Sequence, residues 1–310
     1  MPPPRTLRIA TRGSPMALYQ AGLVRDRVCA AHPDLAVAGA VELVPIRTTG
    51  DRVLNRRLAE IGGKGLFTKE IEEALLDRRV DLAVHSLKDM ETVLPQGLEI
   101  ACVLPRDDPR DVLVVRDGGG LAGLPAGARI GTASLRRGAQ LLRRRSDFVI
   151  VPVRGNVGTR LGRLAAGELD ALVLALCGLE RLGRAGLASE ILAPEAMLPA
   201  VGQGALAIEC RAADEHLRQL LAPLNDAASA ACVTAERAML AALDGSCRTP
   251  IAGLATIAGE RLDLVALLLT PDGNAERRGR IAGPAGEAAA LGRALGERLR
   301  RGAGAEFGFA

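Results

Sequence analysis

The sequence predicts an α/β fold, with two α/β domains followed by a small α+β domain at the C-terminus. Strand and helix patterns alternate from Leu7 to about Glu209, which is typical of parallel or mixed sheets with helices on both faces. From Asp226 the pattern changes to a long Ala-rich helix, three strand-like runs and a last helix. The length of 310 residues suits two or three domains. We place the boundaries at 1–104 with 203–222 for the first domain, 105–202 for the second and 223–310 for the third.

The first helix has the clearest local signals. Ser14 can cap it and Pro15 suits its first position, so we expect a helix from Pro15 to about Ala31. Gly62, Gly63 and Gly65 favour a loop over 53–66. The other elements expected in this part are strands at 7–10, 41–47 and 81–84 and an amphipathic helix at 67–79.

The middle of the chain repeats the alternation. We expect strands at 111–115, 129–131, 148–153 and 170–176, and helices at 134–145 and 156–167, the latter capped by Asn156. The Pro/Gly-rich stretch 199–204 is predicted to carry the chain back to the first domain as a strand at 203–209. In the last part we expect a helix at 226–243, strands near Ile251, Leu262 and Arg277, and a helix with Leu291, Leu295 and Leu299 on one face.

Composition excludes several classes of protein. A net charge of +4 and an aromatic content of 2% argue against a nucleic-acid-binding protein. The six cysteines form no C-x-x-C pair and only three histidines are present, so no metal site or disulfide framework is expected. The longest apolar stretches are far shorter than the roughly 20 residues of a membrane span. No signal core follows the N-terminal prolines, and we therefore expect a cytoplasmic protein.

Three polar clusters follow predicted strands, where α/β sheets bind ligands. They are 11–14, 131–137 and 153–160, and each offers backbone N–H groups, hydroxyl groups and arginines to an anion. One such cluster could be helix capping alone, but three of them favour a ligand with several carboxylates or phosphates. A P-loop is excluded because 62–65 lacks the required spacing and follows no strand.

Two further residues are candidates for chemistry. Asp89 follows the strand at 81–84, and a carboxylate among basic groups can stabilise a developing cation. A lone Asp beside Lys88 could equally be a surface turn. Cys247 lies in a turn-like loop next to Arg248, which favours thiolate chemistry, whereas the other five cysteines are expected to be small buried residues. We expect His85 to be a structural hydrogen-bonding residue.

A series of specific segments runs through the chain: TRGSPMAL, GDR, GGKGLFTKEIE, AVHSLKD, LPRDDPRDVL, GTASLRR, VRGNVGTRL, LPAVGQGALAIE and the Cys247 loop. In these segments and their order, the chain resembles the porphobilinogen deaminase, or hydroxymethylbilane synthase, family over nearly its whole length. The resemblance implies three domains, the first two similar to periplasmic binding proteins. It also implies condensation of four porphobilinogen molecules with loss of ammonia, on a dipyrromethane cofactor held by a thioether, followed by hydrolytic release of linear hydroxymethylbilane.

The resemblance also implies roles for individual residues. Cys247 matches the cofactor attachment site and Asp89 the catalytic aspartate. Lys64 and Phe67 fall in the family's mobile lid segment, and Gln203 in the returning strand. The residues that match its cofactor and substrate contacts are Arg12, Ser14, Ser86, Lys88, Thr132, Ser134, Arg136, Arg137, Arg154 and Arg160.

The sequence departs from the family at one place near Asp89. The family commonly has a proline two residues after the aspartate, and here that position is Glu91. A local φ constraint is lost and a charge is added. We expect a monomer that acts on porphobilinogen without nucleic acid, membrane or metal. A non-catalytic, two-lobed solute-binding protein is the alternative, since two α/β lobes with an anion site describe both.

Overall fold

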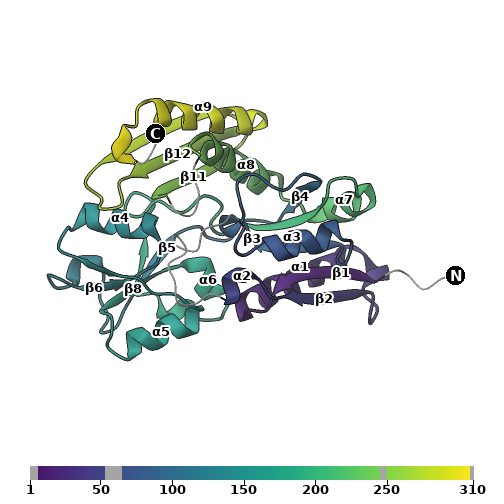
Figure 1. Cartoon of the computed structure of the whole chain (residues 1–310), viewed down its shortest axis with the longest axis horizontal. Coiled ribbons are helices and arrows are strands. Elements are labelled where there is room, and N and C mark those ends of the chain that lie inside the picture. Colours follow the sequence, from purple (N-terminus) through teal and green to yellow (C-terminus); the bar gives the residue numbers. More distant parts are fainter. Residues whose placement is uncertain (1–5, 53–64, 245–248, 308–310) are drawn as a thin grey trace. The chain divides into compact units, whose positions relative to one another are not determined.

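The computed structural model describes residues 6–52, 65–244 and 249–307. The chain forms two compact units, Met1–Arg106 with Ala205–Ala230, and Asp107–Gly204 with Ala231–Ala310 (Figure 1). Each contains a five-stranded sheet of mixed direction, and the second also contains a three-stranded antiparallel sheet. The predicted α/β class is therefore confirmed. The second unit combines most of the predicted second and third domains, and the division into three domains stays a prediction.

The sheet of the first unit has the order β2-β1-β3-β10-β4. β1 runs parallel to β2 and β3, whereas β10 runs antiparallel to β3 and β4. The predicted return of the chain to the first unit after 199–204 is confirmed, because β10 lies between two strands formed some hundred residues earlier. The bounds are β1 Leu7–Arg12, β2 Val41–Ile46, β3 Leu82–Ser86, β4 Leu98–Val103 and β10 Leu206–Arg211.

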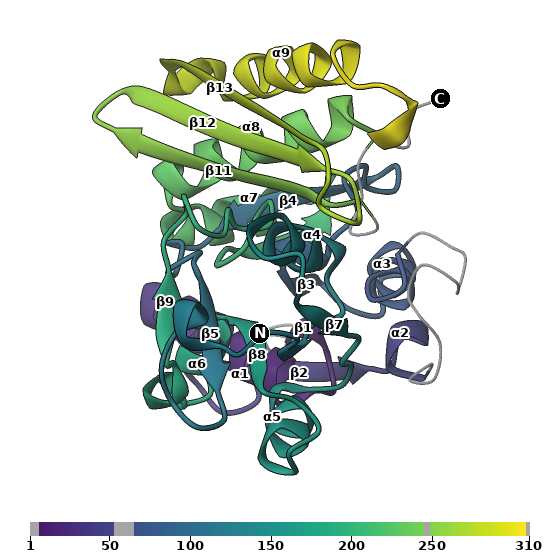
Figure 2. The same cartoon turned by 90° about the vertical axis from the view of Figure 1, so that its left-hand side faces the viewer.

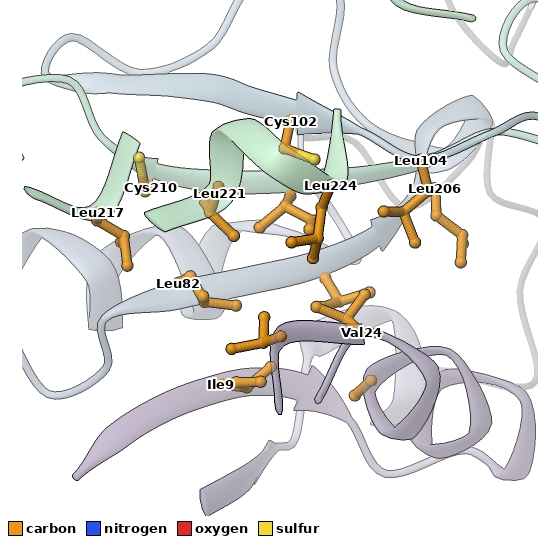
Figure 3. Close-up of a cluster of buried hydrophobic side chains, with 14 of the residues drawn as sticks. Ile9, Val24, Leu82, Cys102, Leu104, Leu206, Cys210, Leu217, Leu221 and Leu224 are labelled. Carbon is orange, nitrogen blue, oxygen red and sulfur yellow. The ribbon is translucent and has the colours of Figure 1, made fainter. Parts of the chain in front are cut away.

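Helices cover both faces of this sheet, as predicted. On one face, α1 (Pro15–Ala31) and α7 (Glu215–Leu221) pack on the apolar side chains of β1, β3 and β10 (Figure 3). On the other face, α3 (Lys69–Leu76) buries Ile71 and Leu75 against Ala10 and Ala83. A short helix, α2 (Thr49–Arg52), precedes the residues outside the described part. α3 is shorter than predicted because the chain turns at Gly65–Thr68 before it and adopts a positive φ at Arg78 after it.

The five-stranded sheet of the second unit repeats this arrangement in the order β7-β6-β8-β5-β9. As in the first unit, three neighbouring strands run parallel, here β7, β6 and β8, and the next strand, β5, runs antiparallel to β8. α4 packs on one face, and α5 and α6 on the other. The bounds are β5 Asp111–Val115, β6 Arg129–Gly131, α4 Leu135–Arg144, β7 Val149–Val151, α5 Val157–Ala165, β8 Ala171–Ala175, α6 Leu176–Glu180 and β9 Glu190–Leu192.

The C-terminal sheet carries two helices on one face (Figure 2). Gly292 and Gly296 of α9 let it approach α8 closely, since a Cβ at either position would lie 2.1 or 2.5 Å from a carbonyl oxygen of α8. The other face packs on Ala139 of α4. The predicted helices and strands are confirmed, with bounds α8 Ala227–Ala242, β11 Ile251–Ala258, β12 Arg261–Leu269, β13 Glu276–Pro284 and α9 Ala288–Arg301.

Candidate functional site

The first unit brings three of the predicted site residues to one edge of its sheet. β1 and β3 are parallel neighbours, so their last residues, Arg12 and Ser86, lie at the same edge. The Ser14 hydroxyl accepts a hydrogen bond from the N–H of Ala17 at 3.3 Å, which confirms its capping role. The Ser86 hydroxyl is joined to the Gln20 side chain of α1, at 2.9 Å from Nε2. A cation and two hydroxyl groups thus gather around the start of α1.

Arg12 is held by Asp51 and by Phe67, the second of which belongs to the predicted lid segment. Its guanidinium forms an ion pair with Asp51, and its Cζ lies 4.2 Å from the centroid of the Phe67 ring. Partial burial of Asp51 opposes its ionisation, but hydrogen bonds from Arg12 and Thr48 outweigh this and lower its pKa. A Cβ at Gly50 would lie 2.2 Å from the Phe67 ring, so only glycine fits beside this ring. Phe67 is therefore fixed against Arg12. Lys64 lies outside the described residues.

Asp89 lies on an anchored turn that directly follows β3. Leu87 and Met90 on either side of the turn are buried, whereas Asp89 is exposed and Lys88 is half-buried. The N–H of Leu87 donates to the carbonyl of Ala205, and that of Met90 to the carbonyl of Leu87, both at 3.1 Å. The fold thus presents the Asp89 carboxylate to solvent on a fixed backbone, at the same sheet edge as Arg12 and Ser86.

Glu91 contacts Gly65, the first described residue after the segment 53–64. Its Oε1 accepts a hydrogen bond from the N–H of Gly65 at 2.7 Å. Gly65 has a φ of +70°, which favours glycine. Glu91, at the position where the family commonly has proline, thus links the Asp89 turn to the start of the Gly65–Thr68 turn.

A buried pair of polar side chains, His85 and Glu209, joins β3 to β10. The ring nitrogen Nε2 of His85 lies 3.0 Å from Oε2 of Glu209, and both side chains are buried. The expected structural role of His85 is confirmed by this pairing. Glu72 of α3 is also buried, and desolvation together with the charge of Glu209 raises its pKa, although Thr68 and His85 oppose the shift.

The second unit gathers a second set of predicted residues at the ends of β6 and β7. These strands are parallel neighbours, so the segments after Gly131 and Val151 leave the same edge. Ser134 caps α4 by accepting from the N–H of Arg137 at 3.4 Å, and Thr132 Oγ1 accepts from the N–H of Ser134 at 3.2 Å. Near the start of α5, Arg160 Nε donates to the carbonyl of Gly155 at 2.8 Å, and Arg154 is half-buried.

Arg136 and Arg137 are less accessible than the sequence pattern suggests. They are 4% and 6% exposed, and both form ion pairs with Asp111, at 2.8 and 2.7 Å. Gln203, also buried, donates to the same carboxylate at 2.8 Å. Burial would raise the pKa of Asp111, but the two guanidinium groups outweigh it and hold this pKa far below its ordinary value. The expectation that both arginines face a ligand thus overlooked an internal partner.

Asp111 and Asp51 are the residues that sequence reasoning missed. Asp111 had a signal, because an acid opening the otherwise apolar strand Asp111–Val115 needs a cationic partner when buried. Asp51 had none stronger than its place in the GDR segment.

The donor set suits a group with several carboxylates, such as a dipyrromethane. Arginine offers planar pairs of N–H donors to carboxylates, and the buried Nε of Arg136 has no hydrogen-bond partner among the described residues. The residues present therefore fit that group. No cluster of three or more His, Cys, Asp or Glu in the described part could hold a metal ion.

The described cysteines are poor candidates for attachment. Cys102, Cys177, Cys210 and Cys232 are buried and Cys29 is half-buried. Burial raises the pKa of Cys102 to about 12 and that of Cys210 to about 11, which disfavours the thiolate. Cys247 lies outside the described residues, and its role stays a prediction.

Comparison with known proteins gives a consistent result. The family described as "Porphobilinogen deaminase, dipyromethane cofactor binding domain" matches residues 7–219, and "Porphobilinogen deaminase, C-terminal domain" matches residues 230–301. A porphobilinogen deaminase of Paracoccus denitrificans is 52% identical, over 99% of this chain and 98% of its own length. That of Sorangium cellulosum is 52% identical, over 96% and 100%, and that of Syntrophotalea carbinolica is 51% identical, over 94% and 92%.

Similarity to solved structures is more distant. A TRAP periplasmic solute binding protein from Desulfovibrio salexigens is 12% identical, over 71% of this chain and 72% of its own, with a TM-score of 0.42. No helix in the described part of the chain is long and apolar enough to cross a membrane.

Proposed function

The chain belongs to the porphobilinogen deaminase family, and from this premise we propose how its residues carry out the reaction. The protein is a transferase that condenses four porphobilinogen molecules head to tail on a covalently held dipyrromethane. Each condensation releases ammonia, and hydrolysis releases linear hydroxymethylbilane. The observation that supports our assignment of roles is the exposed Asp89 carboxylate, on a turn anchored by buried neighbours.

The dipyrromethane supplies the pyrrole end to which substrate is joined and the carboxylates by which it is held. We assign its attachment to Cys247, which matches the family's cofactor cysteine. The carboxylates of cofactor and substrate would be held by Arg12, Lys88, Arg154 and Arg160 together with the Nε of Arg136, which is unpartnered among the residues that the structure describes. Hydroxyl groups of Ser14, Ser86, Thr132 and Ser134 would orient the same carboxylates. The guanidinium and hydroxyl donors gathered at the edges of the two sheets support this assignment.

Asp89 is assigned the electrostatic role. Loss of ammonia from porphobilinogen leaves a cation delocalised into the pyrrole ring of the substrate. A carboxylate held close to the pyrrole N–H stabilises that cation more than it stabilises the neutral substrate, which lowers the barrier. The turn Leu87–Asp89 fixes the backbone that carries the carboxylate before substrate arrives, so little backbone reorganisation is needed.

Phe67, Lys64 and Gln203 are assigned supporting roles. Phe67 holds the guanidinium of Arg12, and Gln203 holds Asp111. Lys64 would act with the lid segment. We further propose that the protein acts as a monomer in the cytoplasm, on porphobilinogen and without nucleic acid or membrane partners. The modest net charge of +4 supports the absence of a nucleic-acid partner.

The proposed function is tested by incubating the purified protein with porphobilinogen and measuring ammonia and tetrapyrrole together. We expect four molecules of ammonia for each hydroxymethylbilane. A protein that binds porphobilinogen without releasing ammonia would instead be the two-lobed solute-binding protein. Size-exclusion chromatography of the same sample tests the monomer.

A further inference from the structure

Asp111 reaches the functional edge of its sheet although it begins a strand. β5 runs antiparallel to β8, so Asp111 pairs with Ala175, the last residue of β8. β6 runs parallel to β8 and ends at Gly131, at the same edge. The antiparallel direction of one strand therefore places an acid among the basic residues that follow the others. Asp111 is fully buried there.

Three side chains contact this single carboxylate, two of them through hydrogen bonds and the third through an ion pair. Arg137 binds Oδ1 through Nε at 3.1 Å and Nη2 at 2.7 Å, and Gln203 Nε2 binds the same oxygen at 2.8 Å. Arg136 Nη1 lies 2.8 Å from Oδ2. Gln203 also donates to the carbonyl of Pro109 at 2.6 Å, which fixes its amide. Asp111 is thus the common partner of two arginines that are adjacent in sequence.

Arg136 and Arg137 differ in how many of their guanidinium nitrogens have a partner within the chain. Arg137 also donates from Nη1 to the carbonyl of Val173 at 3.0 Å, so each of its three guanidinium nitrogens has a partner within the chain. Arg136 donates from Nη1 to the carbonyl of Leu198 at 2.7 Å, but its Nε has no partner in the described part of the chain. Two cations share one carboxylate, which leaves a buried surplus of positive charge. Such a surplus favours binding of an additional anion.

We propose that Asp111 is a positioning residue, which holds Arg137 as an internal support and orients Arg136 toward a carboxylate of the ligand. This inference rests on the proposed function. Two adjacent guanidinium groups repel each other, and a long arginine side chain has many rotamers to lose on binding. The shared carboxylate removes both obstacles before the ligand arrives. Its loss should therefore weaken ligand binding more than it slows the chemical step.

The test compares Asp111→Asn with Asp81→Asn as a matched control. Asp81 is 7% exposed, precedes β3 at the opposite edge of its sheet, and pairs with Arg8 at 3.2 Å and with Arg211 at 3.9 Å. The cofactor content of each protein is measured by intact mass. KM and kcat are then determined, and kcat is calculated per cofactor-loaded molecule. We expect both variants to melt at lower temperature. Only Asp111→Asn should raise KM, by about tenfold or more, with a much smaller change in kcat.

An unchanged KM in folded Asp111→Asn, or an equal rise in Asp81→Asn, would overturn the proposal. If Asp111→Asn does not fold, the double variant Asp111→Asn/Arg137→Gln removes one charge of each sign. It should also show a raised KM, and a wild-type KM in it would contradict the proposal. Calorimetric measurement of porphobilinogen binding distinguishes a failure of the Asp111 inference from a failure of the proposed function. A wild-type protein that binds but releases no ammonia refutes the proposed function, while the affinities of the two variants still test Asp111.

Discussion

The guanidinium carbon of Arg12 lies 4.2 Å from the centroid of the Phe67 ring, which binds the last residue of β1 to a residue just before α3. The same guanidinium pairs with Asp51, so both its ion-pair partner and its aromatic partner belong to the first unit. A ligand carboxylate would meet an arginine whose position is set by an aromatic ring and an acid. The contribution of the ring can be measured separately from that of the charge.

Phe67→Leu should weaken substrate binding and leave the chemistry intact. A cation over an aromatic face contributes about 0.5–1 kcal/mol at an accessible site, which corresponds to a rise of about two- to fivefold in KM. The control is Phe148→Leu, because Arg145 lies 4.3 Å from the Phe148 ring, which precedes β7 and is away from the carboxyl ends of the parallel strands. Phe148→Leu should lower the melting temperature without changing KM. Equal KM effects in both variants would contradict the role of Phe67.

Asp89→Asn should fold normally and lose turnover. Asp89 is exposed, so the free energy of unfolding should change by no more than about 0.5 kcal/mol. Removal of the charge should reduce the rate of ammonia release on the order of a hundredfold or more. Asp89→Glu, which keeps the charge but displaces it, should fall between the two.

Glu91→Gln is the control for the same turn. Its amide oxygen can still accept the hydrogen bond from the N–H of Gly65, so turnover should stay close to that of the wild type. Near-normal turnover in Asp89→Asn together with a large loss in Glu91→Gln would transfer the electrostatic role to Glu91.

Arg160→Lys should impair cofactor assembly or chain elongation without unfolding the protein. Lysine keeps the charge but loses the planar pair of donors, and we expect about a tenfold loss of activity. Arg163 lies on the same helix, α5, and pairs with Glu168 at 2.7 Å, so Arg163→Lys is a matched control with near-normal activity. Product analysis by mass spectrometry would show stalled intermediates in the first variant. Their absence, with wild-type rates, would place the carboxylate site elsewhere.

The buried Glu72 gives a pH-dependent prediction of stability. Its pKa in the folded protein is raised above the ordinary value of 4.5, chiefly by desolvation and by the charge of Glu209. The folded state therefore favours the protonated form, and the stability associated with it is full below about pH 4.5 and is lost as the pH rises through the raised pKa. Glu72→Gln removes this loss. Its free energy of unfolding relative to wild type should be more favourable at pH 7 than at pH 4.

Urea unfolding at the two pH values measures this difference. Glu73→Gln is the control, because Glu73 is exposed on the same helix and pairs only loosely with Lys69, at 4.0 Å. Its effect should be nearly the same at both pH values. A Glu72→Gln effect that does not vary with pH would mean that Glu72 is not preferentially protonated in the folded protein.

Local signals predicted much of the fold. Ser14, Ser134 and Asn156 each cap the helix that follows them, as their side-chain hydrogen bonds to backbone N–H groups confirm. Strand pairing was harder to predict from the sequence, because β10 pairs with β3 across more than a hundred residues. The strands β4 and β9 and the helices α2, α6 and α7 were missed. α7 had a signal that was overlooked, since the Asp214 side chain caps it by accepting from the N–H of Leu217.

The part of the site that lies at the ends of parallel strands was predictable from the sequence. Arg12 and Ser86 each follow or end a strand of the parallel group, and that topology alone brings them to one edge. Pairing of Arg136 and Arg137 with Asp111 depends on an antiparallel strand that starts at this edge. Local sequence patterns indicate that a buried acid needs partners, but they do not indicate which arginines are nearest in space.

The central claim is that this chain holds a dipyrromethane on Cys247, and the intact mass of the purified protein tests it most directly. Wild-type protein should exceed the mass of the bare 310-residue chain by two pyrrole units. Cys29→Ser, a change at the half-buried cysteine, should keep the added mass, whereas Cys247→Ser should lose both the added mass and the activity. A wild-type mass equal to that of the bare chain, or an adduct retained in Cys247→Ser, would contradict the account.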